Sequence, residues 1–327
     1  MVKKERIPVI DVLTMMATIL VVMGHHKFLR PMVDWYFTYD KIIYSFHMGF
    51  FMTLSGFLIR YSFPTSCCWK NYWGKKFKKF VPAYFAVGLI ASLLTFKSMK
   101  LFGYDMLMLL ISPTKGSIQI IWYIYVLLIF YALSPIVFKL TTKGREYLFF
   151  VSLLMAVFYP YMPKFFCINQ EIRMFPFFLI GSIFCDNRGK IKMISDTYLF
   201  LLSLPFLIFC GLRLISCKLV LYGDIEYLIC SLSSLPFMYF IARQFLKFPK
   251  VVNMSRKFSS YVFPIYLLQM FFINAWNLIR IKLNIILTNT TAILYLIVSV
   301  VLTIVSIVYM VKLYRLCIKT LKTNALK

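Results

Sequence analysis

Residues 290–311 read TTAILYLIVSVVLTIVSIVYMV, a stretch without a charged side chain. A helix needs about 20 mostly apolar residues to cross roughly 30 Å of hydrocarbon. The stretch therefore predicts a membrane-spanning helix. Comparable apolar runs, separated by charged residues or by Pro and Gly, recur at 7–25, 41–60, 80–96, 117–138, 146–162, 173–185, 194–213, 222–242 and 259–278.

The composition extends this prediction to the whole chain. Of the 327 residues, 61% are hydrophobic and 15% are charged, and the mean hydropathy is +0.80. Soluble domains average about 25% charged residues, and a disordered chain would need a low apolar content. About ten spans use roughly 200 residues and leave only short connections. We therefore expect an all-α fold, a polytopic transmembrane helical bundle that forms one integral membrane domain over residues 1–327.

The distribution of charge predicts the orientation of this bundle. The net charge is +26, and cytoplasmic loops of membrane proteins collect Lys and Arg, so nucleic-acid binding is disfavoured. With both termini in the cytoplasm, about two thirds of the 37 Lys and Arg fall in cytoplasmic segments. This favours an N-in, C-in arrangement. Ile7–Met23 lacks a small-residue cleavage site and is interpreted as a retained first span, whereas Leu101–Ile111 is too short to cross and is expected at the interface or in a re-entrant segment.

The cysteines predict neither a disulfide framework nor a zinc site. None belongs to a C-x-x-C pair, and most lie in apolar runs, where a free Cys behaves as a small hydrophobe. We therefore expect no bound metal. The cysteines are Cys67, Cys68, Cys167, Cys185, Cys210, Cys217, Cys230 and Cys317.

Three histidines are the first candidates for chemistry, because ionisable groups at membrane depth are costly and usually functional. All of them, His25, His26 and His47, lie near the first two spans. A connection of about fifteen residues makes these spans antiparallel neighbours, which predicts His25 and His47 at similar depth on the outer side. The alternative, favoured for His26, is that an interfacial histidine only bonds headgroups or backbone.

The segments around these histidines resemble a known family. His25 follows Asp11 by fourteen residues, as in the first-span signature of the acyltransferase-3 family of integral membrane acyltransferases. Residues 44–58, YSFHMGFFMTLSGFL, are similar to its second-span pattern F-H-M-x-x-F-F-x-x-S-G-F. Residues 76–84, KFKKFVPAY, resemble its cytoplasmic motif R-x-x-R-x-x-P-x-Y. Weaker landmarks lie at 122–128, 175–181 and 260–268.

The chain departs from the family pattern at three places. Thr14 stands where the family usually has Arg, three residues after the Asp. Lys76 and Lys79 stand where Arg is commoner, and Gln269 stands where the family often has His in the ninth span. Lysine binds phosphate as a point charge but lacks the bidentate fork of arginine.

The resemblance implies a function. Such enzymes take an acyl group, commonly acetyl, from cytoplasmic acyl-CoA and place it on a hydroxyl of a cell-surface glycan or its lipid-linked precursor. His25 would then be the general base, a role that suits an imidazole near neutral pH. His47 would assist as a second catalytic histidine that orients His25, orients the acceptor or donates to the oxyanion. Lys76 and Lys79 would bind the donor phosphates. No cofactor would be permanently bound, and acetyl-CoA would be the donor substrate of a multi-pass protein in the bacterial inner membrane.

The remaining motif residues can be interpreted as structural or as functional. Asp11 lies about 21 Å below His25 on a straight helix, so it is expected to bind neighbouring donors or a cytoplasmic Lys rather than act as acid or base. Ser55 and Gly56 are interpreted as close helix packing or as a place where the acyl arm approaches backbone. The lysines either anchor the chain to anionic lipid or hold the donor, and Tyr84 is a supporting residue.

Two rival functions remain. A transporter or flippase for a glycan or small molecule would predict polar residues through several later spans, whereas spans four to ten are largely apolar and contain no histidine. A catalytically impaired relative that acts as a scaffold is kept open by Thr14 and Gln269. The expected partners are acyl-CoA, a glycan or lipid-linked glycan acceptor and the lipid bilayer.

Overall fold

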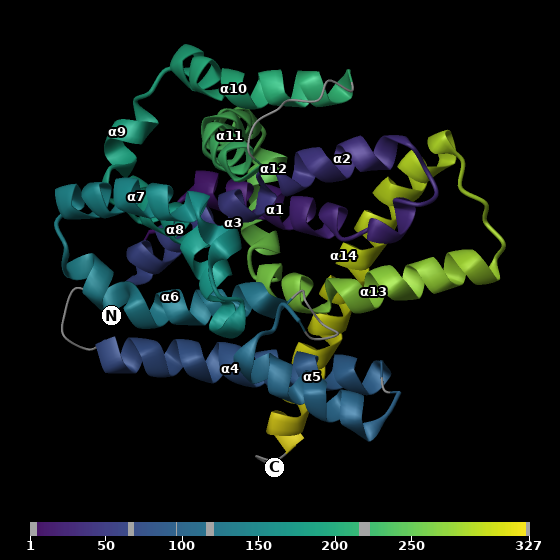
Figure 1. The fold of residues 1–327 in the computed structure, drawn as a ribbon. Coiled ribbons are helices and arrows are strands. Elements are labelled where there is room, and N and C mark those ends of the chain that lie inside the picture. Colours follow the sequence, from purple (N-terminus) through teal and green to yellow (C-terminus); the bar gives the residue numbers. More distant parts are fainter. Residues whose placement is uncertain (1–4, 65–68, 96, 116–120, 216–222, 325–327) are drawn as a thin grey trace. The chain divides into compact units, whose positions relative to one another are not determined.

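The computed structural model describes residues 5–64, 69–95, 97–115, 121–215 and 223–324, and its regular elements in these ranges are all helices (Figure 1). The prediction of an all-α fold is confirmed. Of the cysteines, Cys67, Cys68 and Cys217 lie outside the described residues, as does the beginning of the predicted span 117–138. Among the described residues, no group of three or more His, Cys, Asp or Glu could hold a metal ion.

The chain divides into two compact units that interleave along the sequence. The first comprises Gly49–Ser195 and Tyr222–Leu228, and the second comprises Glu5–Met48, Asp196–Leu221 and Ile229–Lys327. Two of the boundaries fall inside helices, in α3 and α11, and each unit is described by itself.

In the first unit, α7 packs along α8, and α4 packs against both α5 and α6. A tyrosine hydroxyl joins α4 to α5: Tyr84 is buried and donates to the carbonyl oxygen of Leu109 at 2.6 Å. The helices here are α3 (His47–Ser62), α4 (Trp69–Leu94), α5 (Met99–Ile111), α6 (Trp122–Lys139), α7 (Thr142–Val157), α8 (Ile168–Asp186) and α9 (Arg188–Lys192), with short 3-10 turns at Tyr159–Tyr161 and Phe165–Cys167.

In the second unit, an apolar core forms where α1, α2, α13 and α14 meet, and it includes Val22, Tyr36, Ile273 and Val300. Helix α12 packs against α1, and α10 packs against α2. The helices are α1 (Pro8–Gly24), α2 (Trp35–Tyr44), α10 (Asp196–Leu214), α11 (Gly223–Phe245), α12 (Pro249–Phe258), α13 (Val262–Lys282) and α14 (Asn289–Asn324), with a 3-10 turn at Lys27–Leu29.

Seven helical segments among the described residues are long and apolar enough to cross a membrane. Helix α1 is apolar but shorter, with 17 residues. The predicted spans at 146–162 and 173–185 correspond to α7 and α8, which are not among the seven. The count of about ten spans therefore stays a prediction, as does the N-in, C-in orientation. The seven segments are Trp35–Ser62, Lys70–Leu94, Trp122–Lys139, Asp196–Leu214, Asp224–Phe245, Val262–Lys282 and Asn289–Ile318.

Three predicted boundaries differ from the structure. The second span was expected from residue 41 but begins at Trp35, and it is interrupted between Tyr44 and His47. The third was expected from residue 80, whereas α4 begins at Trp69 and contains the lysines within the helix. The segment Leu101–Ile111 lies in α5, whose 13 residues begin at Met99, directly after the capping residue Ser98. Charged and aromatic residues extend these helices before the apolar runs, so hydropathy alone places their first residues too late.

A close backbone contact in the first unit joins α3 and α8 through two glycines. A Cβ on Gly56 would lie 2.1 Å from the carbonyl oxygen of Phe178, and a Cβ on Gly181 would lie 2.0 Å from that of Thr53. Each glycine thus lets one backbone reach the other, as at small-residue crossings of membrane helices. Of the two readings of Gly56, this geometry supports close helix packing.

Candidate functional site

His25 caps the C-terminal end of α1, and its side chain is partly buried. Its Nδ1 lies 2.6 Å from the carbonyl oxygen of Val21. A carbonyl oxygen only accepts, so Nδ1 carries the proton, and the Nε2 of the neutral ring keeps its lone pair. Nε2 has no hydrogen-bond partner in the part of the chain that the structure describes. The backbone thereby sets this imidazole in the tautomer that a base requires.

His47 is the first residue of α3 and is only 1% exposed. Its Nδ1 donates to the carbonyl oxygen of Ile43 at 2.7 Å, so this ring has the same tautomer as His25. The Tyr44 ring meets the His47 ring edge-on at 4.6 Å between centroids. The Tyr44 hydroxyl donates to the carbonyl oxygen of Gly24 at 3.0 Å. Tyr44 therefore holds the end of α1 beside His47.

These contacts bring His25 and His47 together within the second unit. A Cβ on Gly24, the residue next to His25, would lie 3.9 Å from the Nε2 of His47. The ammonium of Lys27 lies 4.5 Å from the centre of the Tyr44 ring. Two neutral imidazoles and a cation thus share one small region.

His26 has a different environment from its neighbour. It is fully buried, its Nδ1 donates to the carbonyl oxygen of Val22 at 3.0 Å, and its Nε2 lies 2.7 Å from the hydroxyl of Ser299 on α14. Both ring nitrogens are engaged by the protein. This geometry supports the structural reading of His26.

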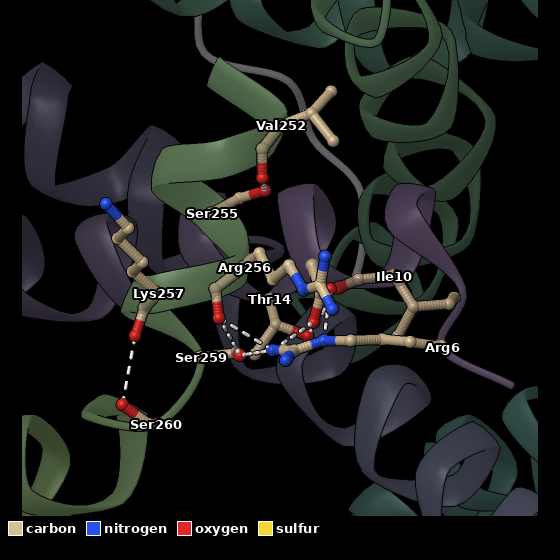
Figure 2. Close-up of polar contacts among 10 residues, drawn as sticks. Arg6, Ile10, Thr14, Val252, Ser255, Arg256, Lys257, Ser259 and Ser260 are labelled. Carbon is tan, nitrogen blue, oxygen red and sulfur yellow. Dashed lines mark hydrogen bonds and ion pairs between the residues drawn. The ribbon is translucent and has the colours of Figure 1, made fainter. Parts of the chain in front are cut away.

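Asp11 pairs with an arginine rather than with a lysine. Arg6 donates from Nε to Oδ2 of Asp11 at 2.7 Å and from Nη2 to Oδ1 at 3.2 Å. Figure 2 shows the same guanidinium reaching α12, where Nη2 donates to the carbonyl oxygen of Arg256 at 2.7 Å and to the Ser259 hydroxyl. Thr14 bonds only its own helix, to the carbonyl oxygen of Ile10 at 2.7 Å (Figure 2). Arg6 lies outside the family motifs, so the sequence did not indicate this contact.

Lys76 and Lys79 lie on one face of α4, beside a pair of stacked rings. Phe80 and Tyr131 stack at 5.6 Å between centroids. The Nζ of Lys76 lies 5.3 Å from the Tyr131 ring centre and 5.5 Å from that of Tyr72. The Nζ of Lys79 lies 5.4 Å from the Phe80 ring centre. Aromatic faces thus hold both ammonium groups at the same end of the helix.

Three further motif residues have structural partners. The hydroxyls of Ser55 and Tyr123 lie 2.5 Å apart and join α3 to α6. Tyr84 holds α5, as described above, and does not contact the lysines through its hydroxyl. Gln269 is fully buried in α13, where Nε2 donates to the carbonyl oxygen of Tyr266 at 3.2 Å. Its Oε1 has no hydrogen-bond partner within the described segments.

An ion-pair cluster was missed at the sequence level. Arg60, Arg145 and Asp186 come from three helices of the first unit and meet at one carboxylate. The residues are far apart in sequence, and none lies in a quoted motif position. Arg60 and Asp186 each stand at the end of an apolar run, and this position is the one feature of the sequence that could have pointed to the cluster.

The fold and the histidine pair define a helical membrane protein with a polar site at the C-terminal end of α1. The model of an acyltransferase domain, that of the acyltransferase-3 family, matches residues 7–311. The chain therefore belongs to the acyltransferase-3 family and is a membrane acyltransferase. No curated protein and no solved structure gives a significant match.

Proposed function

We propose that this acyltransferase moves an acyl group, acetyl in the first instance, from cytoplasmic acyl-CoA to a hydroxyl of a cell-surface glycan or its lipid-linked precursor. The observation that carries the proposal is the tautomer of His25. Its proton is held by the Val21 carbonyl oxygen, and Nε2 is left as an acceptor. The reaction needs such an acceptor, because a sugar hydroxyl must lose its proton as it attacks a thioester.

The proposed chemistry is a single acyl transfer. His25 Nε2 removes the hydroxyl proton while the hydroxyl oxygen attacks the thioester carbonyl carbon. The carbon–sulfur bond then breaks, and the thiolate of CoA takes the proton from the imidazolium, so His25 returns to its neutral state. In neutral His47 the Nδ1 proton is hydrogen-bonded to the Ile43 carbonyl oxygen and Nε2 is an acceptor. We therefore assign His47 to orienting the acceptor by accepting a hydrogen bond from a neighbouring hydroxyl of the sugar, rather than to donating to the oxyanion.

Lys76 and Lys79 are proposed to bind the donor phosphates. Their spacing of three residues places them on one helix face, and the Phe80–Tyr131 stack lies beside both. The proposal needs no permanently bound cofactor and no metal ion. In line with the positive-inside rule, it places the lysines on the cytoplasmic side of the bacterial inner membrane.

The test replaces His25 by asparagine. The amide nitrogen of Asn stands where Nδ1 stood, so the Val21 bond can persist while the Nε2 base is lost. We expect acetyl transfer from radiolabelled acetyl-CoA to surface glycan to fall by about 10²–10⁴-fold, the usual contribution of a general base. The matched control is His26→Asn, which keeps the Val22 bond and loses the Ser299 contact, and which should retain transfer. Undiminished acetyl content in cells carrying His25→Asn would refute the assignment.

A second measurement separates this function from transport. Acetyl-CoA should raise the thermal stability of the purified wild-type protein, since a ligand that binds the native state stabilises it by mass action. A glycan transporter has no reason to respond. A protein that binds acetyl-CoA but transfers nothing, with His25 intact, would point to the impaired relative.

A further inference from the structure

A carboxylate in the first unit holds two guanidinium groups at the ends of three helices. Asp186 is the last residue of α8, Arg60 lies in the last turn of α3, and Arg145 lies in the first turn of α7. The Nε of Arg60 donates to Oδ1 of Asp186 at 2.9 Å, and Nη2 of Arg145 pairs with Oδ2. Nη1 of Arg145 donates to the Ser182 hydroxyl at 3.2 Å.

The charges in this cluster do not balance. Two guanidiniums share one carboxylate, and the side chain of Arg145 is only 1% exposed. A buried charge without full compensation is costly. In addition, the Nε of Arg145 is buried and has no hydrogen-bond partner among the described ranges of the chain. An anion beside the two arginines would offset the excess positive charge, and the N-terminus of α7 adds a further favourable dipole.

Arg60 presents an open face for such an anion. Asp186 fixes its Nε, and the guanidinium carbon lies 5.3 Å from the centre of the Phe138 ring. Its Nη1 and Nη2 have no hydrogen-bond partner among the residues that the structure describes, and the side chain is 29% exposed. A guanidinium held in this way has two N–H groups pre-positioned for the bidentate binding of phosphate.

Aromatic contacts connect this cluster to the lysine end of α4. The Phe138 ring lies 5.1 Å from the Phe63 ring, and Phe63 lies 5.4 Å from Tyr72, between centroids. The Nζ of Lys76 lies 5.5 Å from the Tyr72 centre. Arg60 and Lys76 therefore flank one run of aromatic rings. Phosphate-binding cations on either side of aromatic surface suit an adenine nucleotide, whose base stacks while its phosphates are paired.

We propose that Arg60, supported by Arg145 and positioned by Asp186, binds a phosphate group of the nucleotide end of acyl-CoA. This site rests on the proposed function. It adds to the point charges of Lys76 and Lys79 a guanidinium whose two N–H groups can bind a phosphate in a bidentate geometry. Arg60 is a binding residue, and Asp186 is a positioning residue that acts through it.

The test measures CoA binding to the purified full-length protein in lipid-free detergent micelles, by titration calorimetry. Arg60→Gln should weaken CoA binding about tenfold or more, because a charge-assisted bidentate contact is lost. Arg60→Lys keeps the charge and should weaken it less. Lys139→Gln is the matched control: it removes an exposed positive charge next to Phe138 and should change affinity by less than about twofold. Thermal melting without ligand shows whether each variant is folded. If Arg60→Gln does not fold, the comparison is made with Arg60→Lys instead.

Dephospho-CoA, which lacks the 3′-phosphate, identifies the group that is bound. If the effect of Arg60→Gln vanishes with this probe, Arg60 binds the 3′-phosphate. If the effect persists, Arg60 binds the diphosphate, and both results support the site. Equal CoA affinity of Arg60→Gln and wild type overturns it. A loss seen only in stabilisation by phosphatidylglycerol also overturns it and identifies a lipid-headgroup site. Wild-type protein that binds no CoA contradicts the proposed function itself.

Discussion

At the scale of single residues, Asp11 already has the guanidinium that the family pattern would place at position 14. Arg6 reaches it with two hydrogen bonds and continues to α12. The departure at Thr14 therefore does not leave Asp11 unpaired. We interpret Arg6 as the residue that supplies this contact from outside the helix.

Arg6→Ala should lower the free energy of unfolding by about 1 kcal/mol, since its bonds to charged and carbonyl groups are lost but the side chain is half exposed. Thr14→Arg should offset this loss in the Arg6→Ala background, because three residues along a helix bring a new guanidinium beside Asp11. In the wild-type background it should bring no gain, since Thr14 is nearly buried and Asp11 is paired. Thermal melting and acetyl transfer are the readouts. A large rise in transfer for Thr14→Arg alone would mean that the native chain is impaired.

At the scale of helices, the α3–α8 crossing depends on two missing side chains. Gly56→Ala or Gly181→Ala would place a methyl group about 2 Å from a backbone carbonyl oxygen, so the helices must separate. We expect each to destabilise the protein by more than the roughly 1–3 kcal/mol of ordinary overpacking, which would be seen as a lower melting temperature and lower yield.

Gly103→Ala in α5 is the control for this pair. Nothing lies within 4 Å of its Cβ position, and Ala favours a helix over Gly by up to about 1 kcal/mol. The control should be neutral or slightly stabilising. Equal melting of all three variants would show that α3 and α8 do not approach this closely.

Much of the helix order follows from hydropathy, and the histidine pair follows from a short connection between neighbouring segments. Side-chain pairings that depend on tertiary packing cannot be predicted in this way. Nothing in the local sequence says that Tyr44 binds the Gly24 backbone or that Ser299 binds His26, since those partners meet only after folding. Likewise, Arg60, Arg145 and Asp186 converge through three helices, so only a structure could show that they share a carboxylate.

At the scale of the whole molecule, the number of crossings is the main open prediction. Helix α7 has 16 residues, about 24 Å, which is less than a typical hydrocarbon core, and α8 begins with polar and charged residues. If both cross, the turn at Met162 lies outside and both termini lie inside.

Alkaline phosphatase is active only outside the cytoplasm. A fusion of it after Met162 should therefore be active in a bacterial host, and a fusion at the C-terminus should be inactive. A fusion after Leu140, between α6 and α7, is the cytoplasmic reference. An inactive fusion after Met162 would show that α7 and α8 do not cross the membrane. An active fusion at the C-terminus would show that the C-terminus lies outside, against the inferred orientation.

Helix α14 has 36 residues, which gives a rod of about 54 Å. Tilts of membrane helices reach about 40°, and even that inclination leaves a rise of roughly 41 Å against about 30 Å of hydrocarbon. Part of the rod must therefore emerge into water however it leans. Its final turns, past the contact of Arg315 with the Ser260 backbone, are the place to attach an affinity handle for immobilising the enzyme without disturbing its interior.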